Sequence, residues 1–591
     1  MNRRPTCIAS MLGAALFLLV ASPSHGATWW RLPLWGAEVK VFAVDPFDAN
    51  TLYCGTSRGN FYGSTDGGST WTALRQGAAF PGYIATGLIT DSKVPGRLWA
   101  SLAGQYQGGL VARSDDRGAN WTVLARWRMS IATRALALAP LTSDDPPVLA
   151  VGGDDGVRLS TDGGETWTLT GDTTPGLYQV ESLAFAPGES KTLYAGTWRQ
   201  AFRTRDGGRT WSRIAEGMVL DASVYAWDFD SSDPKDIWVS TCGWVYRTHD
   251  GGDRWTRFKT GFTNRRSHNV RRDPNRRGVI YAGTVGGLHR STDGGETWSR
   301  VSRDTLVVTA LEVDRRTGRL FVGTEGEGVF YSDDGGATLA PGSVGLAEGR
   351  VSDLIPDPKD PSRVFFFRAY AGGESGVWEA KGMRVRRLSL DSLPPAAALT
   401  AFRDPAGATV LLLSSFSGLR ISFDGGERWS VPERPPAGTP LALYGTEFGS
   451  PVLVTTAGVF RTFDGRGFAR LPGSPDAPSS AEILADSFGT AILEIRTADG
   501  ASRWDGSSWD NRRHAMLSGG KFLDAYHGDR EPLPVRTPVR EVDGNLVWEE
   551  SGRRRAVRSP RPGLSIATTL ATAEGRLYVG TAGDGLFLFE P

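Results

Sequence analysis

Two acidic residues are candidates for the cleavage of a sugar substrate. Asp228 ends the segment Tyr225-Ala226-Trp227-Asp228, and Glu181 lies on an earlier short apolar segment. A pair of carboxylic acids can cleave a glycosidic bond, one acting as general acid and the other as base or nucleophile, and aromatic rings beside an acid offer a platform for a sugar. Glu181 and Asp228 are therefore the candidate catalytic residues of a glycoside hydrolase. The alternative is that both acids simply solvate a channel.

A run of cationic residues suggests a different chemistry, the binding of an acidic partner. Its members are Arg265, Arg266, His268, Arg271 and Arg272. Guanidinium groups bind carboxylates through paired hydrogen bonds, so such a cluster on a loop could hold a protein or peptide. The alternative is a solvated face on which these residues pair with nearby Asp.

The spacing of His and Cys gives no support for metal or cofactor chemistry. None of the six His stands in a His-x-x-x-His pattern, and the three Cys form no Cys-x-x-Cys pair. No phosphate-binding loop or dinucleotide fingerprint occurs. We therefore expect no metal and no cofactor, and we expect His249 and His289 at the surface.

The elements that must position these residues come from an internal repeat. The pattern Ser/Thr-x-Asp-x-Gly-x-Thr-Trp recurs mostly every 40–50 residues, with weaker copies toward the end of the chain. Asp-Gly and Gly-Gly pairs favour tight hairpins, and the carboxylate can accept hydrogen bonds from turn N–H groups. We therefore assign a structural role to the repeated acids: Asp66, Asp116, Asp162, Asp206, Asp250, Asp293, Asp334 and Asp424.

These segments resemble the Asp-box, or BNR, repeat. It is shared by sialidases, sortilin-type ectodomains, tandem-propeller xyloglucanases and photosystem II assembly factors. The resemblance implies β-propellers whose boxes lie on the blade periphery, away from the binding face. It does not carry over catalytic residues, because no Arg-Ile-Pro segment precedes the boxes, and the segment 35–41 lacks the Gly-rich Phe-Val opening of the xyloglucanases.

The repeat count predicts an all-β chain with two tandem β-propellers of four-stranded blades. Seven good boxes indicate a first propeller over residues 27–343. The degenerate remainder, 344–591, indicates a second propeller of six or seven blades. Residues 28–32 resemble the strand that follows a box. We expect them to complete the seventh blade and close the first propeller, although the last blade could also take them.

The N-terminus and the composition limit where the protein works. Residues 1–26 have the charged start, apolar stretch and small residues of a secretory signal peptide. No second long apolar run follows, so we expect an exported chain, periplasmic or extracellular, with no membrane segment after cleavage. The net charge of +1 gives no overall attraction to nucleic acid.

Two functions fit these features. We favour a non-enzymatic binding or scaffold protein, a monomer that holds a protein or peptide on a propeller face, with carbohydrate as the alternative ligand class. The alternative is a secreted glycoside hydrolase, xyloglucanase-like or sialidase-like, with a cleft between or on the propellers.

Overall fold

The computed structural model describes most of the chain between residues 28 and 590. The predicted signal peptide, 1–26, lies outside the described residues. The others left out are 27, 33, 35, 75–79, 81, 105–106, 130, 142–145, 220–222, 305, 347, 349, 370–375, 389–395, 416, 446–449, 486–490, 511–539, 543–544, 551–552, 561–565, 572–575, 582–584 and 591.

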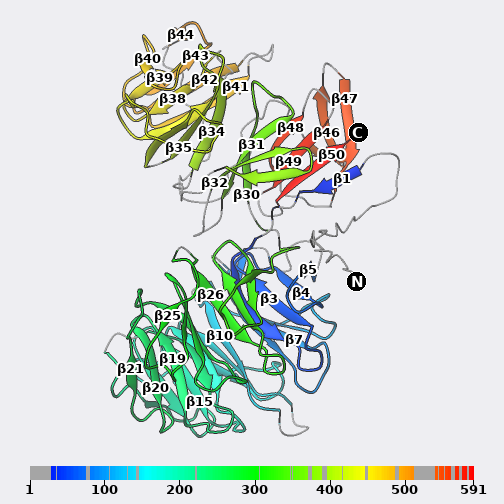
Figure 1. Cartoon of the computed structure of the whole chain (residues 1–591), viewed down its shortest axis with the longest axis vertical. Coiled ribbons are helices and arrows are strands. Elements are labelled where there is room, and N and C mark those ends of the chain that lie inside the picture. Colours follow the sequence, from blue (N-terminus) through cyan, green and yellow to red (C-terminus); the bar gives the residue numbers. More distant parts are fainter. Residues whose placement is uncertain are drawn as a thin grey trace, which may run out of the picture.

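The described residues form thirteen antiparallel sheets, which confirms the predicted all-β fold of blades. Eleven sheets have four strands and two have three. Figure 1 shows the sheets in two bodies, a lower one coloured blue to green and an upper one that holds the yellow and red strands. In the described part of the chain, no helix has the length and hydropathy needed to cross a bilayer.

The lower body, here the first ring, contains seven four-stranded sheets in chain order. Their strands are β2 Val39–Val44, β3 Leu52–Thr56, β4 Phe61–Ser64, β5 Thr72–Ala73; β6 Tyr83–Thr90, β7 Leu98–Gly104, β8 Gly108–Ser114, β9 Thr122–Arg126; β10 Thr133–Leu138, β11 Leu149–Gly153, β12 Gly156–Ser160, β13 Thr168–Thr170; β14 Val180–Phe185, β15 Leu193–Thr197, β16 Ala201–Thr204, β17 Ser212–Arg213; β18 Val224–Phe229, β19 Ile237–Thr241, β20 Trp244–Thr248, β21 Thr256–Phe258; β22 Ser267–Arg272, β23 Ile280–Thr284, β24 Gly287–Ser291, β25 Ser299–Arg300; and β26 Val308–Val313, β27 Leu320–Thr324, β28 Val329–Ser332, β29 Ala340–Pro341.

The upper body, here the second ring, contains the other six sheets. Their strands are β30 Arg350–Pro356, β31 Arg363–Ala369, β32 Gly376–Lys381, β33 Arg384–Arg387; β34 Ala396–Arg403, β35 Thr409–Ser415, β36 Gly418–Ser422; β37 Pro440–Tyr444, β38 Val452–Thr455, β39 Gly458–Arg461, β40 Ala469–Arg470; β41 Ser480–Ala485, β42 Ala491–Thr497, β43 Gly500–Trp504, β44 Trp509–Asp510; β45 Arg540–Val542, β46 Asn545–Glu550, β47 Arg553–Arg558; and β48 Ile566–Ala571, β49 Leu577–Thr581, β50 Leu586–Glu590 together with β1 Thr28–Arg31.

In the first ring, the repeated acids hold the hairpin between the third and fourth strands of each blade. In the first box, Ser64 Oγ donates to Asp66 at 2.8 Å, and Thr70 donates from its N–H at 2.9 Å and from its hydroxyl at 2.6 Å. The Gly68 N–H donates to Ser64 Oγ at 2.9 Å, so the hairpin is satisfied from within. The same bond from a Ser or Thr hydroxyl, 2.6–2.9 Å long, reaches all eight box acids.

Each box also packs against the preceding blade, which explains its Gly and its Trp. Gly295 has a φ of 96°, and a Cβ there would lie 2.2 Å from the Trp238 ring of the blade before. Trp255 donates from its indole to the Ile214 carbonyl at 2.7 Å, again one blade back. The boxes therefore join neighbouring blades at the periphery, and other residues line the centre of the ring.

Acid should unfold the first ring at a higher pH once the box threonines are replaced by valine. The Thr210 and Thr297 hydroxyls lead the interactions that lower the pKa of Asp206 and Asp293 to about 2, from 3.8. The stabilisation by these carboxylates is therefore complete above about pH 4 and is lost as the pH falls through 2. We expect the Thr210→Val/Thr297→Val chain to unfold at a higher pH than wild type, followed by tryptophan fluorescence. Equal midpoints would contradict this role.

The first ring closes through contacts between its first and seventh blades rather than through a sheet that the two blades share. β2 of the first blade lies beside β26 of the seventh. Thr309 Oγ1 donates to the Val39 carbonyl at 2.5 Å, and the Gly328 N–H donates to the Ala37 carbonyl at 3.0 Å. Trp71 is buried in the same contact and donates from its indole to the Gly342 carbonyl at 2.7 Å.

The expectation that residues 28–32 complete the seventh blade is wrong. That blade has its own fourth strand, β29, which pairs with β28 in spite of Leu339. β1 instead pairs antiparallel with β50, in the register Thr28↔Glu590 to Arg31↔Phe587, and is the outer strand of the last blade (Figure 1). Leu32 and Leu34 follow β1 and are buried against the second ring. This segment therefore completes the last blade and not the seventh.

The two segments that connect the rings run side by side. The Gly36 N–H donates to the Leu346 carbonyl at 2.6 Å, and the Glu348 N–H donates to the Gly36 carbonyl at 3.1 Å. The Glu348 side chain is buried, and its Oε1 accepts from Thr56 Oγ1 at 2.8 Å and Asn60 Nδ2 at 2.7 Å. A carboxyl group thus lies within the connection between the rings, against the first blade.

Glu348→Gln should stabilise the protein at pH 8 and leave it nearly unchanged at pH 4. Burial raises the pKa of Glu348 to about 7, from 4.5. The folded chain therefore holds this proton where the unfolded chain has lost it, and stability falls from pH 4.5 to pH 7 by about 3 kcal/mol. Urea unfolding at both pH values measures the difference. A glutamine variant that keeps the same decline with pH would contradict the assignment.

Candidate functional site

The first strands of the seven blades contact one another in a closed circle, so they surround the central channel of the first ring. They bring polar side chains to one end of this channel. All seven strands, β2, β6, β10, β14, β18, β22 and β26, have a register shift near their start. Such bulges re-aim side chains. The half-buried residues at the second position of four successive strands are Arg134, Glu181, Tyr225 and His268. We call the end of the ring at which these strands begin the channel mouth.

An ion-paired network fixes Glu181 at the channel mouth. Arg134 Nη1 donates to Glu181 Oε1 and Arg134 Nε to Asp154 Oδ1, both at 2.8 Å. The second oxygen of Asp154 accepts from the Ala132 N–H at 2.8 Å. Burial raises the pKa of Glu181, and Arg134 opposes that rise. Glu181 therefore has one firm cationic partner and a side chain that is 16% exposed.

Asp228 lies in a second network, toward the other end of the channel. Arg272 Nε donates to Asp228 Oδ2 at 2.9 Å, and Arg272 Nη1 donates to Asp230 Oδ2 at 3.0 Å. Arg272 Nη2 also donates to the backbone carbonyls of Asp228 at 2.9 Å and Asp236 at 2.7 Å. The structure thus separates the two candidate acids, because Asp228 stands three residues farther along its strand than Glu181 along the neighbouring one.

The cationic cluster divides into three parts. Arg265 and Arg266 are exposed on the loop before β22, and no carboxylate among the described residues lies within ion-pair distance of either. His268 is half-buried, and its Nδ1 lies 3.0 Å from the Val308 carbonyl. Arg271 pairs with Glu312 at 3.4 Å, and Arg272 holds the network around Asp228. Arg265 and Arg266 are thus the members placed to meet a partner.

Two exposed aromatic residues beside the mouth have no counterpart in the sequence prediction. Tyr178 is 50% exposed and Trp198 is 49% exposed. The loops that carry them are joined, because the Trp198 N–H donates to the Gln179 carbonyl at 3.2 Å. Gln179 has a φ of 50°, a strained conformation for a residue with a side chain. The only signal in the sequence was a Trp inside the turn between two strands, where burial is difficult.

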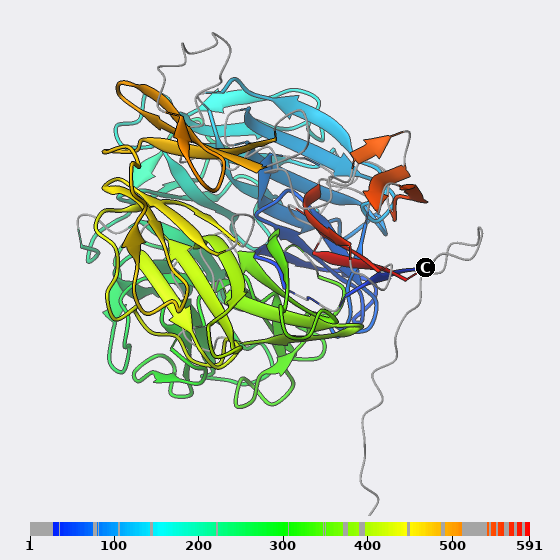
Figure 2. The same ribbon diagram turned by 90° about the horizontal axis from the view of Figure 1, so that it is seen from above.

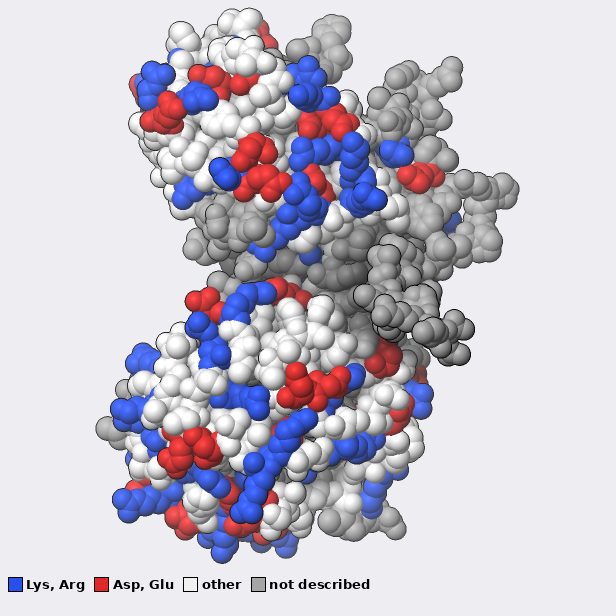
Figure 3. Space-filling view, in the orientation of Figure 1, with Lys and Arg blue, Asp and Glu red and all other residues white. Residues whose placement is uncertain are grey.

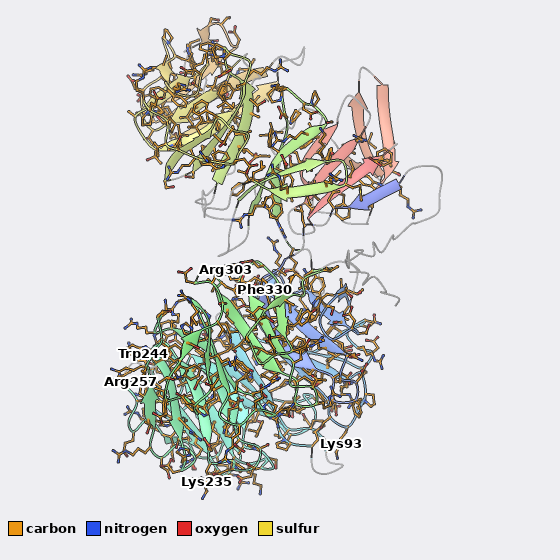
Figure 4. All side chains as sticks on the ribbon, viewed as in Figure 1. Lys93, Lys235, Trp244, Arg257, Arg303 and Phe330 are labelled. Atoms are coloured by element: carbon orange, nitrogen blue, oxygen red, sulfur yellow. The ribbon has the colours of Figure 1, made fainter. Side chains whose placement is uncertain are left out.

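Trp244 extends this surface toward Arg265. It has a φ of 75°, and its N–H donates to the Arg265 carbonyl at 2.6 Å. The Arg257 guanidinium lies 5.3 Å from the centroid of its ring, and Figure 4 shows the two side chains together at one margin of the first ring. Aromatic and arginine side chains therefore succeed one another on the loops of blades four to six.

The labelled residues in Figure 4 show which end of the first ring lies nearer the second ring. In Figure 4, Arg303, from the loop before β26, lies at the end of the first ring nearer the upper body. Lys93 and Lys235, from loops that follow β6 and β18, lie at the opposite end. The visible surface in Figure 3 shows cationic and anionic side chains interspersed on the first ring. The side of the first ring seen in that view is therefore of mixed charge.

No group of three or more His, Cys, Asp or Glu suited to a metal ion occurs among the described residues. Cys54 and Cys242 are not joined by a disulfide. The expected surface position of His289 is wrong: it is buried at 0% exposure against Phe262, and burial lowers its pKa to about 4. His249 is exposed, with 67% of its side chain accessible.

Comparison with known proteins supports the repeat and the fold. A model of the BNR/Asp-box repeat matches residues 289–300. A GH74 xyloglucanase from Xanthomonas campestris is 17% identical, covers 96% of this chain and 100% of its own, and has a TM-score of 0.56. An ancestral GH74 enzyme is 14% identical, covers 95% of this chain and 99% of its own, and has a TM-score of 0.63.

A third structure, YCF48 bound to D1 peptide, is 14% identical, covers 53% of this chain and 97% of its own, and has a TM-score of 0.39. A search of curated proteins finds no match. At these identities the two full-length likenesses establish the fold and nothing finer. The chain therefore carries the BNR/Asp-box repeat on an all-β fold like that of the tandem-propeller xyloglucanases.

Proposed function

We propose that this protein is an exported, non-hydrolytic binding protein whose first ring holds a protein or peptide partner at the channel mouth. The observation that carries the proposal is the surface formed by Tyr178, Trp198, Arg265 and Arg266, all of them exposed on loops of blades four to six. Trp, Tyr and Arg are the residue types that most often dominate the energy of protein interfaces. Backbone hydrogen bonds at Gln179 and Trp244, two residues with positive φ, tie the loops of Trp198 and Arg265 to their neighbours.

The two candidate acids favour binding over hydrolysis. Glu181 is neutralised by Arg134 and Asp228 by Arg272. Glycosidases keep their two carboxyl groups about 5 to 9.5 Å apart, on either side of one bond. Glu181 is the second residue of β14 and Asp228 is the fifth residue of β18. This difference of three residues amounts to about 10 Å in the strand direction alone. A pair so placed and so paired does not suit that reaction.

The immobilised full chain should recover the partner from the exported proteins of its host, and the surface variants should not. We expect Tyr178→Ala/Trp198→Ala and Arg265→Ala/Arg266→Ala each to reduce recovery by at least tenfold, since two hot-spot residues contribute about 2 kcal/mol or more. Arg271 and Arg272 are left intact, because their ion pairs serve the fold. Phe47→Ala, at an exposed residue in the loop between β2 and β3, is the matched control. Equal recovery by all four chains would refute the role of this surface.

Glycoside hydrolysis remains the second candidate function. It is favoured by the likeness to a GH74 xyloglucanase and to an ancestral GH74 enzyme over at least 95% of this chain, and by the suitability of Tyr178 and Trp198 for stacking on sugars. Glu181 would be the acid, because burial already raises its pKa. The test is release of reducing ends from xyloglucan and a panel of other polysaccharides. Activity that Glu181→Gln abolishes would replace the binding proposal, and silence across the panel would support it.

A further inference from the structure

Two neighbouring box hairpins of the second ring carry exposed phenylalanines where the first ring has polar residues. Phe423 is 37% exposed and Phe463 is 59% exposed, each directly before its box Asp. The same position is exposed in all seven hairpins of the first ring. There it holds only polar or charged residues, namely Thr65, Asp115, Thr161, Arg205, His249, Thr292 and Asp333. The hairpin does not require Phe, so these two residues call for another explanation.

The two hairpins form one continuous surface. The Arg466 guanidinium, from the Phe463 hairpin, lies 4.7 Å from the ring centroid of Phe423 in the neighbouring blade. The segment between the hairpins is bound to them, because the Arg434 N–H donates to the Arg466 carbonyl at 3.0 Å. That segment exposes Val431 at 55%. We call this surface of Phe423, Val431, Phe463, Arg434 and Arg466 the hairpin patch.

Charges of both signs surround the hairpin patch. Arg428 and Arg434 are exposed. Glu433 pairs with Arg466 at 3.0 Å, and its side chain remains 65% exposed. Glu427 pairs with Arg386 at 2.6 Å and is 48% exposed. Such exposed pairs are weak, so their members can exchange partners. Figure 3 shows both signs beside uncharged residues on the upper body.

This composition selects among the classes of partner. An anionic membrane attracts a surface of one sign, and the hairpin patch is bordered by the exposed acids Glu427 and Glu433. A symmetric dimer needs one patch that complements itself, and an apolar centre with exposed Arg and Glu around it meets that need. We infer that the hairpin patch is the interface of a symmetric dimer of this chain, in place of the monomer expected from the sequence. β39 and β40 lie at the outer margin of the upper body in Figure 1, so pairing there leaves the first ring accessible in both copies.

Sedimentation velocity of the full chain tests the dimer. Wild type is expected to shift from monomer to dimer across micromolar concentrations, and Phe423→Ser/Phe463→Ser to remain a monomer. Both substitutions are at exposed positions, so circular dichroism and the melting temperature should match wild type. Phe47→Ser, a 50% exposed Phe on the first ring, is the control and should dimerise normally. Phe423→Tyr/Phe463→Tyr should dimerise as well, because the ring contact is kept.

Three results would overturn the inference. The first is a wild-type monomer at every concentration. The second is a dimer that the double serine variant leaves intact. The third is binding of wild type to vesicles containing phosphatidylglycerol that the double serine variant loses, because it would assign the hairpin patch to a membrane.

Discussion

A chain that begins at Gly36 is expected to keep a stable first ring and lose most of the stability of its second ring. The truncation removes β1, the outer strand of the last blade, and leaves the edge of β50 unpaired. It also removes Leu32 and Leu34, whose burial contributes about 1.5–3 kcal/mol each. Trp29 adds a ring contact with Phe589 and a hydrogen bond to the Arg558 carbonyl at 2.8 Å. The total loss is therefore on the order of 5 kcal/mol, a large part of the stability of a domain.

Hydrogen exchange read by mass spectrometry assigns this loss to one ring. The comparison is with a chain that begins at Ala27. Amides of β48 to β50 should exchange much faster in the truncated chain, while those of β2 and β26 should be unchanged. Leu32→Ala/Leu34→Ala, which keeps the strand, should give a smaller effect in the same segments. Faster exchange confined to β2 and β26 would mean that the N-terminal segment serves the first ring after all.

The fold was predictable because each box hairpin depends on its own turn residues. The position of residues 28–31 was not, because it depends on contacts that are distant in sequence. Asp-Gly and Gly-Gly pairs determine a hairpin within eight residues, so each box could be read from the sequence by itself. Residues 28–31 resemble the strand after a box, and that resemblance suits either open edge. The decision rests on Leu32 and Leu34, which meet Val351 and Phe366 in the second ring. These partners are more than 300 residues away in the chain, and no local pattern identifies them.

The candidate site was predictable in composition and not in geometry. Arg265 to Arg272 are close in sequence, but the strand β22 extends for about 3.3 Å per residue. It therefore carries Arg271 and Arg272 away from the channel mouth and leaves Arg265 and Arg266 on the loop before it. Tyr178 and Trp198 lie 20 residues apart in sequence. Their loops are joined by a backbone hydrogen bond, because the loop of Tyr178 leads into β14 at the end of the blade where the loop of Trp198 connects β15 with β16. That contact depends on the sheet register, which repeat spacing alone does not supply.

Arg272→Ala is expected to be the most destabilising single substitution on the surface of the channel. Arg272 lies among Asp228, Asp230 and Asp236, and its side chain is only 17% exposed. Without it, three carboxylates and two backbone carbonyls lose their shared donor. Removing one partner of a buried ion pair costs about 3–5 kcal/mol, because the remaining charges stay desolvated and repel one another. Lysine would restore the charge but not the four hydrogen bonds of the guanidinium, so Arg272→Lys should fall between alanine and wild type.

Urea unfolding of the full chain, with exchange of β18 and β22 amides as the local readout, measures this effect. Arg265→Ala, an exposed neighbour in the same cluster, should change stability by less than about 0.5 kcal/mol. Combining Arg272→Ala with Asp228→Asn should destabilise by less than the sum of the two single changes, since the neutral amide no longer needs the cation. Strict additivity, or an alanine variant as stable as wild type, would contradict the network. Arg272 would then be a surface residue free to bind a partner, as the cluster in the sequence suggested.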